Sequence, residues 1–99
     1  MAEIDVQELK ERITMLLDGI VSHLKVERLS IDPKEDFYWD MHDEQMFDVS
    51  INSPEIVTGR LTDDLEFVRS IQQAEIVPLM LDHVAPLLRY LAHKLPGYR

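Results

Sequence analysis

The stretch that decides the fold class runs from Asp36 to Ile51 and reads DFYWDMHDEQMFDVSI. Two segments within it, about 36–41 and 46–51, alternate apolar and polar side chains. Alternation with a period of two, in residues that are aromatic or β-branched, is typical of β-strands. We therefore predict an antiparallel β-hairpin that turns through residues 42–45.

The same alternation assigns two faces to this predicted hairpin. The inner face should carry the large apolar side chains of the stretch, which are Phe37, Trp39, Met41, Phe47, Val49 and Ile51. Residues that pair across two strands share a face, so Trp39 should pair with Phe47 or with Val49. The register with the longer loop places Asp40 opposite Asp48 on the outer face, which also carries Tyr38. Like charges in such a pair are mildly destabilising, and a face that binds a cationic partner tolerates them more readily.

A helix is predicted before the hairpin, from about residue 5 to about residue 25. Asp5 and Glu8 have the spacing of a capping box, in which an N-terminal side chain accepts a hydrogen bond from a backbone amide three residues later. An apolar stripe at helical spacing follows, made of Val6, Leu9, Ile13, Leu16, Leu17, Ile20 and Leu24. Lys25 and Arg28 suit the negative end of the helix dipole.

Two more helices are predicted in the second half of the chain. Thr62-Asp63-Asp64 places acids where a helix begins, which favours a helix over about 63–74. The apolar phase continues through Pro86, which favours one helix over about 78–95 that bends at this proline. Residues 52–61 fit a third short strand, a helical turn or a loop. The fold class is therefore α+β, in one small domain of residues 1–99 with two helices after the hairpin.

The negative charge of the chain is confined to one region. Residues 35–66 hold ten acids and one base, Arg60. The net charge of this region is thus −9, which equals the net charge of the whole chain. Such a region repels nucleic acid and anionic lipid, and it attracts basic protein surfaces. We therefore expect a basic protein partner and no direct contact with nucleic acid or membrane. The candidate partner-binding residues are Tyr38, Asp40, Asp43, Glu44, Asp48, Asp63 and Asp64.

Composition excludes several classes of site and protein. The chain has no cysteine, which excludes disulfides, a thiol nucleophile and a thiolate zinc site. It has no apolar run of about 20 residues, and its acidic N-terminus is unlike a signal peptide, so we expect a cytoplasmic protein. No glycine-rich phosphate loop and no Gly-x-Ser-x-Gly nucleophile motif is present.

Three hypotheses for the function follow from these patterns. The first is a non-catalytic binding module, such as a nuclease-toxin immunity protein, another inhibitor or an adaptor. The second is a metal-dependent or acid–base enzyme that uses carboxylates of the hairpin, with His42 as one more candidate ligand. Because no other motif supports a metal or cofactor, we expect none. The third is a homodimer or larger homo-oligomer joined through a second apolar patch of the last helix: Leu79, Met80, Leu87 and Tyr90.

Overall fold

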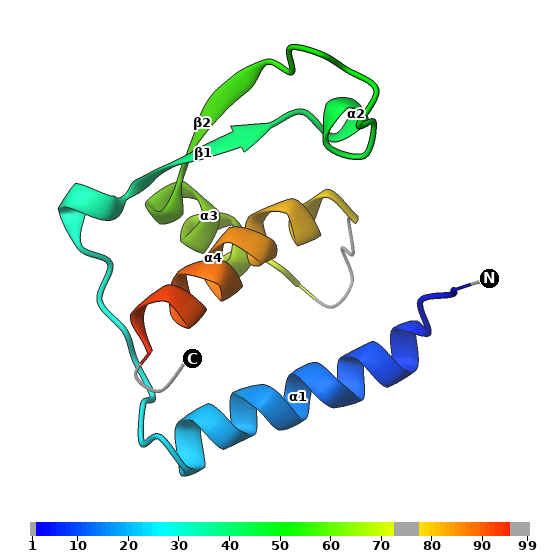
Figure 1. The fold of residues 1–99 in the computed structure, drawn as a ribbon. Coiled ribbons are helices and arrows are strands. Elements are labelled where there is room, and N and C mark those ends of the chain that lie inside the picture. Colours follow the sequence, from blue (N-terminus) through cyan, green and yellow to red (C-terminus); the bar gives the residue numbers. More distant parts are fainter. Residues whose placement is uncertain (1, 73–77, 96–99) are drawn as a thin grey trace. The chain divides into compact units, whose positions relative to one another are not determined.

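The computed structural model describes residues 2–72 and 78–95 of the chain. These residues fall into two compact units, Met1–Ser30 and Ile31–Arg99. Within the described ranges there are four α-helices and one two-stranded antiparallel sheet (Figure 1). A helix comes first, then two strands with a short helix between them, and then two C-terminal helices. Apart from the short helix, this is the predicted order. The α+β class is thus confirmed. No helix within these ranges has the length and the apolar character needed to cross a membrane.

The first unit consists of helix α1, Val6–Ser22, and the segment that follows it. The predicted cap is present, since the Glu8 amide donates to Oδ1 of Asp5 at 3.0 Å. The helix ends before the predicted residue 25 because Lys25 adopts a left-handed backbone conformation with φ of 59°. The reversal is closed by the Val26 amide, which donates to the Ile20 carbonyl at 3.3 Å. Lys25 therefore lies outside the helix that its charge was expected to stabilise.

The sheet of the second unit differs from the predicted hairpin in its second strand. Strand β1, Phe37–Met41, pairs with β2, Ile56–Arg60, and not with residues 46–51. Much of the predicted turn forms instead a short helix, α2, Asp43–Met46. Acids in its first turn suit the positive end of a helix, and the His42 carbonyl accepts from two amides of this turn. Residues 56–60 supply β-branched side chains, so the third-strand alternative is the one that forms.

The two faces of β1 are also opposite to the prediction. Phe37 and Trp39 are 66% and 79% exposed, whereas Tyr38 and Asp40 are half-buried. The hydroxyl of Tyr38 donates to Asp64, which lies in a later helix, so the polar face of β1 turns toward that helix. Asp40 pairs with Val57, so the predicted pairing of Asp40 with Asp48 is wrong.

Helix α3, Leu61–Arg69, begins directly after β2 and earlier than predicted. The Thr62 amide donates to Oδ1 of Asp36 at 2.9 Å, so a carboxylate distant in sequence caps the helix. Leu61 is nearly fully buried, at 2% exposure, and its amide donates to the Asp36 carbonyl at 2.8 Å. The predicted C-terminal residues of this helix, 73 and 74, lie outside the described residues.

The last helix, α4, Leu81–Lys94, follows a short 3-10 turn, η2, Pro78–Met80. It runs through Pro86 as a single helix, as the phase of its apolar residues predicts. Figure 1 shows α3 and α4 against each other beside the β1–β2 ribbon. The end of α4 is fixed to a second 3-10 turn, η1, Pro33–Glu35, because Tyr90 and Lys94 both donate to Oε1 of Glu35, at 2.9 and 2.7 Å.

Candidate functional site

A hydrogen-bonded group of three side chains joins the ribbon to both C-terminal helices. Its centre is Asp64 in the first turn of α3, which is only 3% exposed. Tyr38 of β1 donates its hydroxyl to Oδ2 of Asp64 at 2.6 Å, and Nδ1 of His83 on α4 lies 2.7 Å from Oδ1. An ionised carboxylate only accepts hydrogen bonds, so His83 donates from Nδ1. Both oxygens of the buried carboxylate are thereby satisfied.

The sequence positions Tyr38 through an unusual cross-strand neighbour. Gly59 lies directly opposite Tyr38 in the ribbon, and a Cβ atom at this glycine would overlap the phenol ring. The missing side chain lets the ring lie across β2 and reach α3. Burial, followed by the hydrogen bond to Asp64 and the negative charge of that carboxylate, raises the pKa of the Tyr38 phenol. Tyr38 is therefore a hydrogen-bond donor at neutral pH.

A stacked aromatic ring fixes the orientation of His83. The ring centroids of Phe67 and His83 lie 4.1 Å apart, and their planes are inclined by 9°. Phe67 lies on α3, about one turn after Asp64, whose carboxylate His83 contacts through Nδ1. The imidazole is thus held at one edge by a carboxylate and on one face by a phenyl ring.

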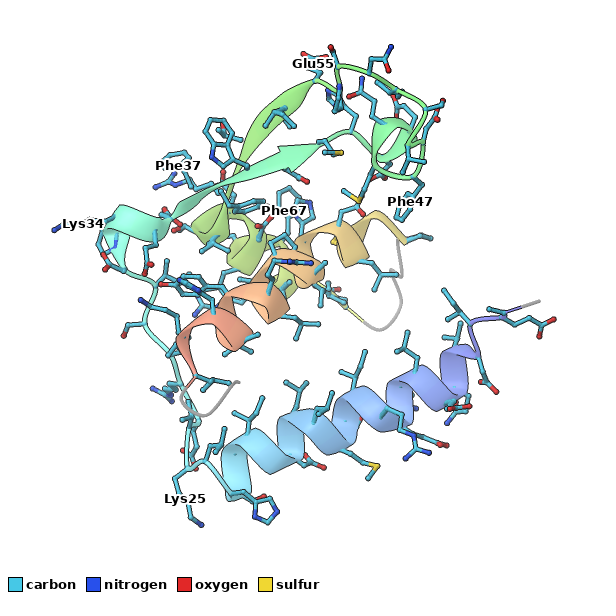
Figure 2. All side chains as sticks on the ribbon, in the orientation of Figure 1. Lys25, Lys34, Phe37, Phe47, Glu55 and Phe67 are labelled. Atoms are coloured by element: carbon cyan, nitrogen blue, oxygen red, sulfur yellow. The ribbon has the colours of Figure 1, made fainter. Side chains whose placement is uncertain are left out.

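These side chains line a hollow of about 350 Å³, which we call the acidic hollow. Its walls come from β1, β2, α3 and α4. Four aspartates contribute, Asp40, Asp63, Asp64 and Asp82, together with the apolar rings of Phe37 and Phe67, which are labelled in Figure 2. The remaining lining residues are Tyr38, Thr58, Gly59, Arg60 and His83.

The negative charge extends beyond the hollow to α2. The charge of Asp82, followed by burial and a hydrogen bond with the same carboxyl group, raises the pKa of Asp43. Asp43 opens α2 and Asp82 lies in the first turn of α4, so two acids distant in sequence lie next to each other. Their mutual repulsion is the physical cause of the shift.

Arg60 is the only lysine or arginine among the described residues that line the hollow. Its Nε donates to Oδ2 of Asp36 at 2.9 Å, so much of its charge is already paired. Asp36 is buried and also accepts from the Thr62 hydroxyl. The Thr62 hydroxyl, followed by the Arg60 guanidinium, lowers the pKa of Asp36. This pair stabilises the start of α3 and leaves the hollow with excess negative charge.

The structure brings together five of the seven predicted partner-binding residues. Tyr38, Asp40, Asp63 and Asp64 line the hollow, and Asp43 joins it through Asp82. The other two lie elsewhere: Glu44 is exposed on α2, and Asp48 lies in the loop after α2, where it accepts from the Ser50 amide at 3.1 Å. The surface predicted from a shared Asp40–Asp48 face is therefore not formed.

The second predicted patch is distributed over η2 and α4. Leu79 and Met80 belong to η2, whereas Leu87 and Tyr90 are half-buried on α4. The Tyr90 hydroxyl donates to Glu35 and accepts from the Asp32 amide at 3.2 Å. Tyr90 thus already contributes to the packing of its own chain.

Seven residues that line the hollow were not predicted. Three of them, Phe67, Asp82 and His83, come from the two C-terminal helices. Each is far in sequence from the acidic segment of the hairpin that pointed to the site, and only the packing of α3 on α4 brings them there. Asp82 and His83 carry no local signal, because no catalytic or metal-ligand motif in the sequence includes them. In the described ranges no group of three His, Asp or Glu side chains is arranged to hold a metal ion.

No protein-family model matches this sequence, and no curated protein or solved structure is significantly similar to it.

Proposed function

We propose that this chain is a small, non-catalytic protein-binding module that docks a basic protein partner through the acidic hollow. The observation that carries the proposal is the excess of carboxylates around one concave site with apolar rings in its walls. A lysine or arginine side chain would find an excess of negative charge there. Phenyl rings attract cations, as the Arg60 guanidinium 5.6 Å from the Phe37 ring centroid illustrates. Long-range attraction would also speed the encounter with a basic surface.

An inhibitor of a nucleic-acid-binding protein is the most concrete version of this proposal. Such a partner has a basic surface that binds phosphates, and a cluster of carboxylates can occupy the same surface. A nuclease-toxin immunity protein fits this description, as does an adaptor for a basic protein. Both versions use the same residues of the hollow and are separated by identifying the partner.

The proposal is tested with a nine-residue arginine peptide as probe, titrated into the ¹⁵N-labelled chain and followed by NMR. We expect the largest shifts at residues of the hollow and an affinity that falls steeply between about 20 and about 300 mM salt. Asp63→Asn should weaken binding roughly two- to five-fold, the usual effect of one exposed charge. Glu55 lies outside the hollow, so the charge-matched control Glu55→Gln should reduce the affinity for the peptide less.

Two results would contradict the proposed site. The first is an affinity for the peptide that does not depend on salt. The second is equal weakening by Asp63→Asn and by Glu55→Gln, because the peptide would then sense only the net charge of the chain. A basic protein captured from the cell extract at low salt should show the same difference between the two variants.

An acid–base enzyme is the second candidate, and the Asp64–His83 pair supports it. A buried carboxylate that holds Nδ1 of a histidine leaves Nε2 to exchange protons with a substrate. Calorimetry with Mg²⁺, Mn²⁺, Ca²⁺ and Zn²⁺ separates a metal-dependent form of this enzyme from the binding module. Micromolar binding that is lost in both His83→Gln and Asp40→Asn would favour metal-dependent chemistry, whereas a chain that binds the arginine peptide and none of these ions would favour the binding module.

A further inference from the structure

Helix α1 carries an apolar stripe that nothing in its own unit covers. No side chain of α1 is buried, and Val6 and Leu16 are 74% and 68% exposed. The rest of the unit, up to Ser30, is a short segment without helix or strand. An isolated helix of this length is only marginally stable in water, so its stripe requires a covering surface. The identity of that surface can be inferred from the order of residues along the stripe.

Five of the seven residues of the stripe follow the heptad pattern of a two-stranded coiled coil, and the other two, Leu17 and Leu24, flank it. Val6, Ile13 and Ile20 occupy the first core position of successive heptads, called a, and Leu9 and Leu16 occupy the second, called d. β-Branched residues at a with leucine at d favour parallel dimers over trimers and tetramers. All five core positions that fall within the helix agree with this preference.

One pair of positions that flank the seam also favours a second copy in parallel orientation, whereas the next pair, Arg12 and Leu17, carries no opposite charges. Asp5 takes position g of one heptad and Lys10 takes position e of the next. In a parallel dimer these two positions face each other across the seam, so each copy would supply one acid and one base to two attractive pairs. The positions farthest from the seam, called f, hold Glu11 and Asp18, which belong in water.

We infer that a second copy of this chain covers the stripe, and that the protein forms a parallel, two-stranded coiled coil through α1. This inference does not depend on the acidic hollow, whose residues all lie in Ile31–Arg99. A dimer would present two acidic hollows to a partner that offers two basic sites, which raises avidity. The seam spans only about two and a half heptads, so we expect a dissociation constant on the order of 10 µM.

Cysteine cross-linking of the full chain tests the arrangement directly. The chain has no cysteine of its own, so each variant carries a single thiol. Leu9→Cys places two thiols in contact in a parallel, in-register dimer and should form a disulfide-linked dimer under mild oxidation. The control Asp18→Cys, at an outer position of the same helix, should cross-link at least ten times more slowly. Equal rates, or a dimer in which Leu9→Cys does not cross-link, would overturn the parallel seam.

Sedimentation equilibrium tests the association itself, between about 1 and about 200 µM protein around the expected dissociation constant. The mass should rise from the 11.6 kDa of one chain toward twice that value. Lys10→Glu, which replaces attraction to Asp5 by repulsion, should weaken the dimer about three-fold or more, whereas the charge-matched Lys34→Glu in the other unit should not. Leu16→Lys should give a monomer whose amide spectrum for residues 31–72 is unchanged.

Two outcomes of the sedimentation experiment would overturn the inference. A chain that is monomeric over the whole range would mean that part of the same chain covers the stripe. A dimer that survives Leu16→Lys would mean that another surface, such as the second apolar patch of α4, joins the copies.

Discussion

Gly59→Ala is the change that most directly tests how the acidic hollow is held together. Gly59 faces Tyr38 across the ribbon, and a Cβ atom at this position would overlap the Cζ, Cε2 and hydroxyl atoms of the phenol. Most of these atoms belong to a ring that lies against the backbone, so a small adjustment does not relieve the overlap. The ring must turn away, and its hydroxyl then loses the Asp64 carboxylate, 2.6 Å distant.

The magnitude follows from two opposing effects. A hydrogen bond to a charged group contributes about 1.5–3 kcal/mol, and Asp64 is buried enough for the loss to be felt. Alanine restricts the unfolded chain more than glycine does, which returns roughly 0.5–1 kcal/mol. The variant should therefore lose about 1–2 kcal/mol of unfolding free energy, equivalent to roughly 4–16 °C in the melting temperature of a domain of this size.

Urea unfolding followed by circular dichroism measures this loss, and a second background isolates its cause. In Tyr38→Ala there is no ring to displace, so Gly59→Ala should be neutral there or stabilise by up to about 1 kcal/mol. Equal destabilisation by Gly59→Ala in both backgrounds would show that the backbone conformation at residue 59 requires glycine, and that the Tyr38 ring is not the reason. A Gly59→Ala protein as stable as the original would refute the close packing itself.

Three further predictions concern the helix end and the carboxylates. Lys25→Gly should stabilise α1 by roughly 0.5–1 kcal/mol, because a residue with a Cβ atom is strained in the left-handed region and glycine is not. Lys25→Ala should give no such gain, and amide hydrogen exchange in α1 measures the stability of both variants. The pKa of Asp36 is lower in the folded chain than in the unfolded chain. The stability that ionised Asp36 contributes is therefore complete above its ordinary, unfolded pKa and is lost as pH falls through its folded pKa. Asp36→Asn should reduce the pH dependence of the unfolding free energy in acid. Asp43→Asn should raise stability at neutral pH, since it removes the repulsion from Asp82 that raises the pKa of Asp43; a lower melting temperature would contradict this reasoning.

Local patterns in the sequence were sufficient to predict three of the four described helices, α1, α3 and α4, and their order. The Asp5 cap and the helical phase through Pro86 depend on neighbours within one or two turns, and the structure contains both. The partner of β1 was mispredicted because the alternation in residues 46–51 resembles a strand. Residues 43–46 form a helical turn instead, and the β-branched run that begins at Ile56 supplies the strand.

The acidic hollow was predictable only in part, for a related reason. The alternation in β1 correctly separates Phe37 and Trp39 from Tyr38 and Asp40, but it does not state which set turns inward. The hydrophobicity of Phe37 and Trp39 led to the prediction that these two side chains turn inward. The cost of turning Tyr38 and Asp40 toward the helices is offset by donors and acceptors that lie on α3 and α4, and their positions depend on tertiary packing. No pattern within the strand contains that information.

The repulsion between Asp43 and Asp82 allows a test of whether the proposed binding site differs from a group of solvated charges. A carboxyl group whose pKa is raised by a like charge makes the folded chain less stable at neutral pH, and α2 and α4 nevertheless bring the two together. A bound cation would remove this repulsion, so binding and stability should be linked: the arginine peptide should raise the melting temperature, and by less in Asp43→Asn. If the pair is only an accident of packing, Asp43→Asn should gain stability and lose no affinity for the peptide. A gain in stability together with a loss of affinity would be the result expected of a site that binds basic groups.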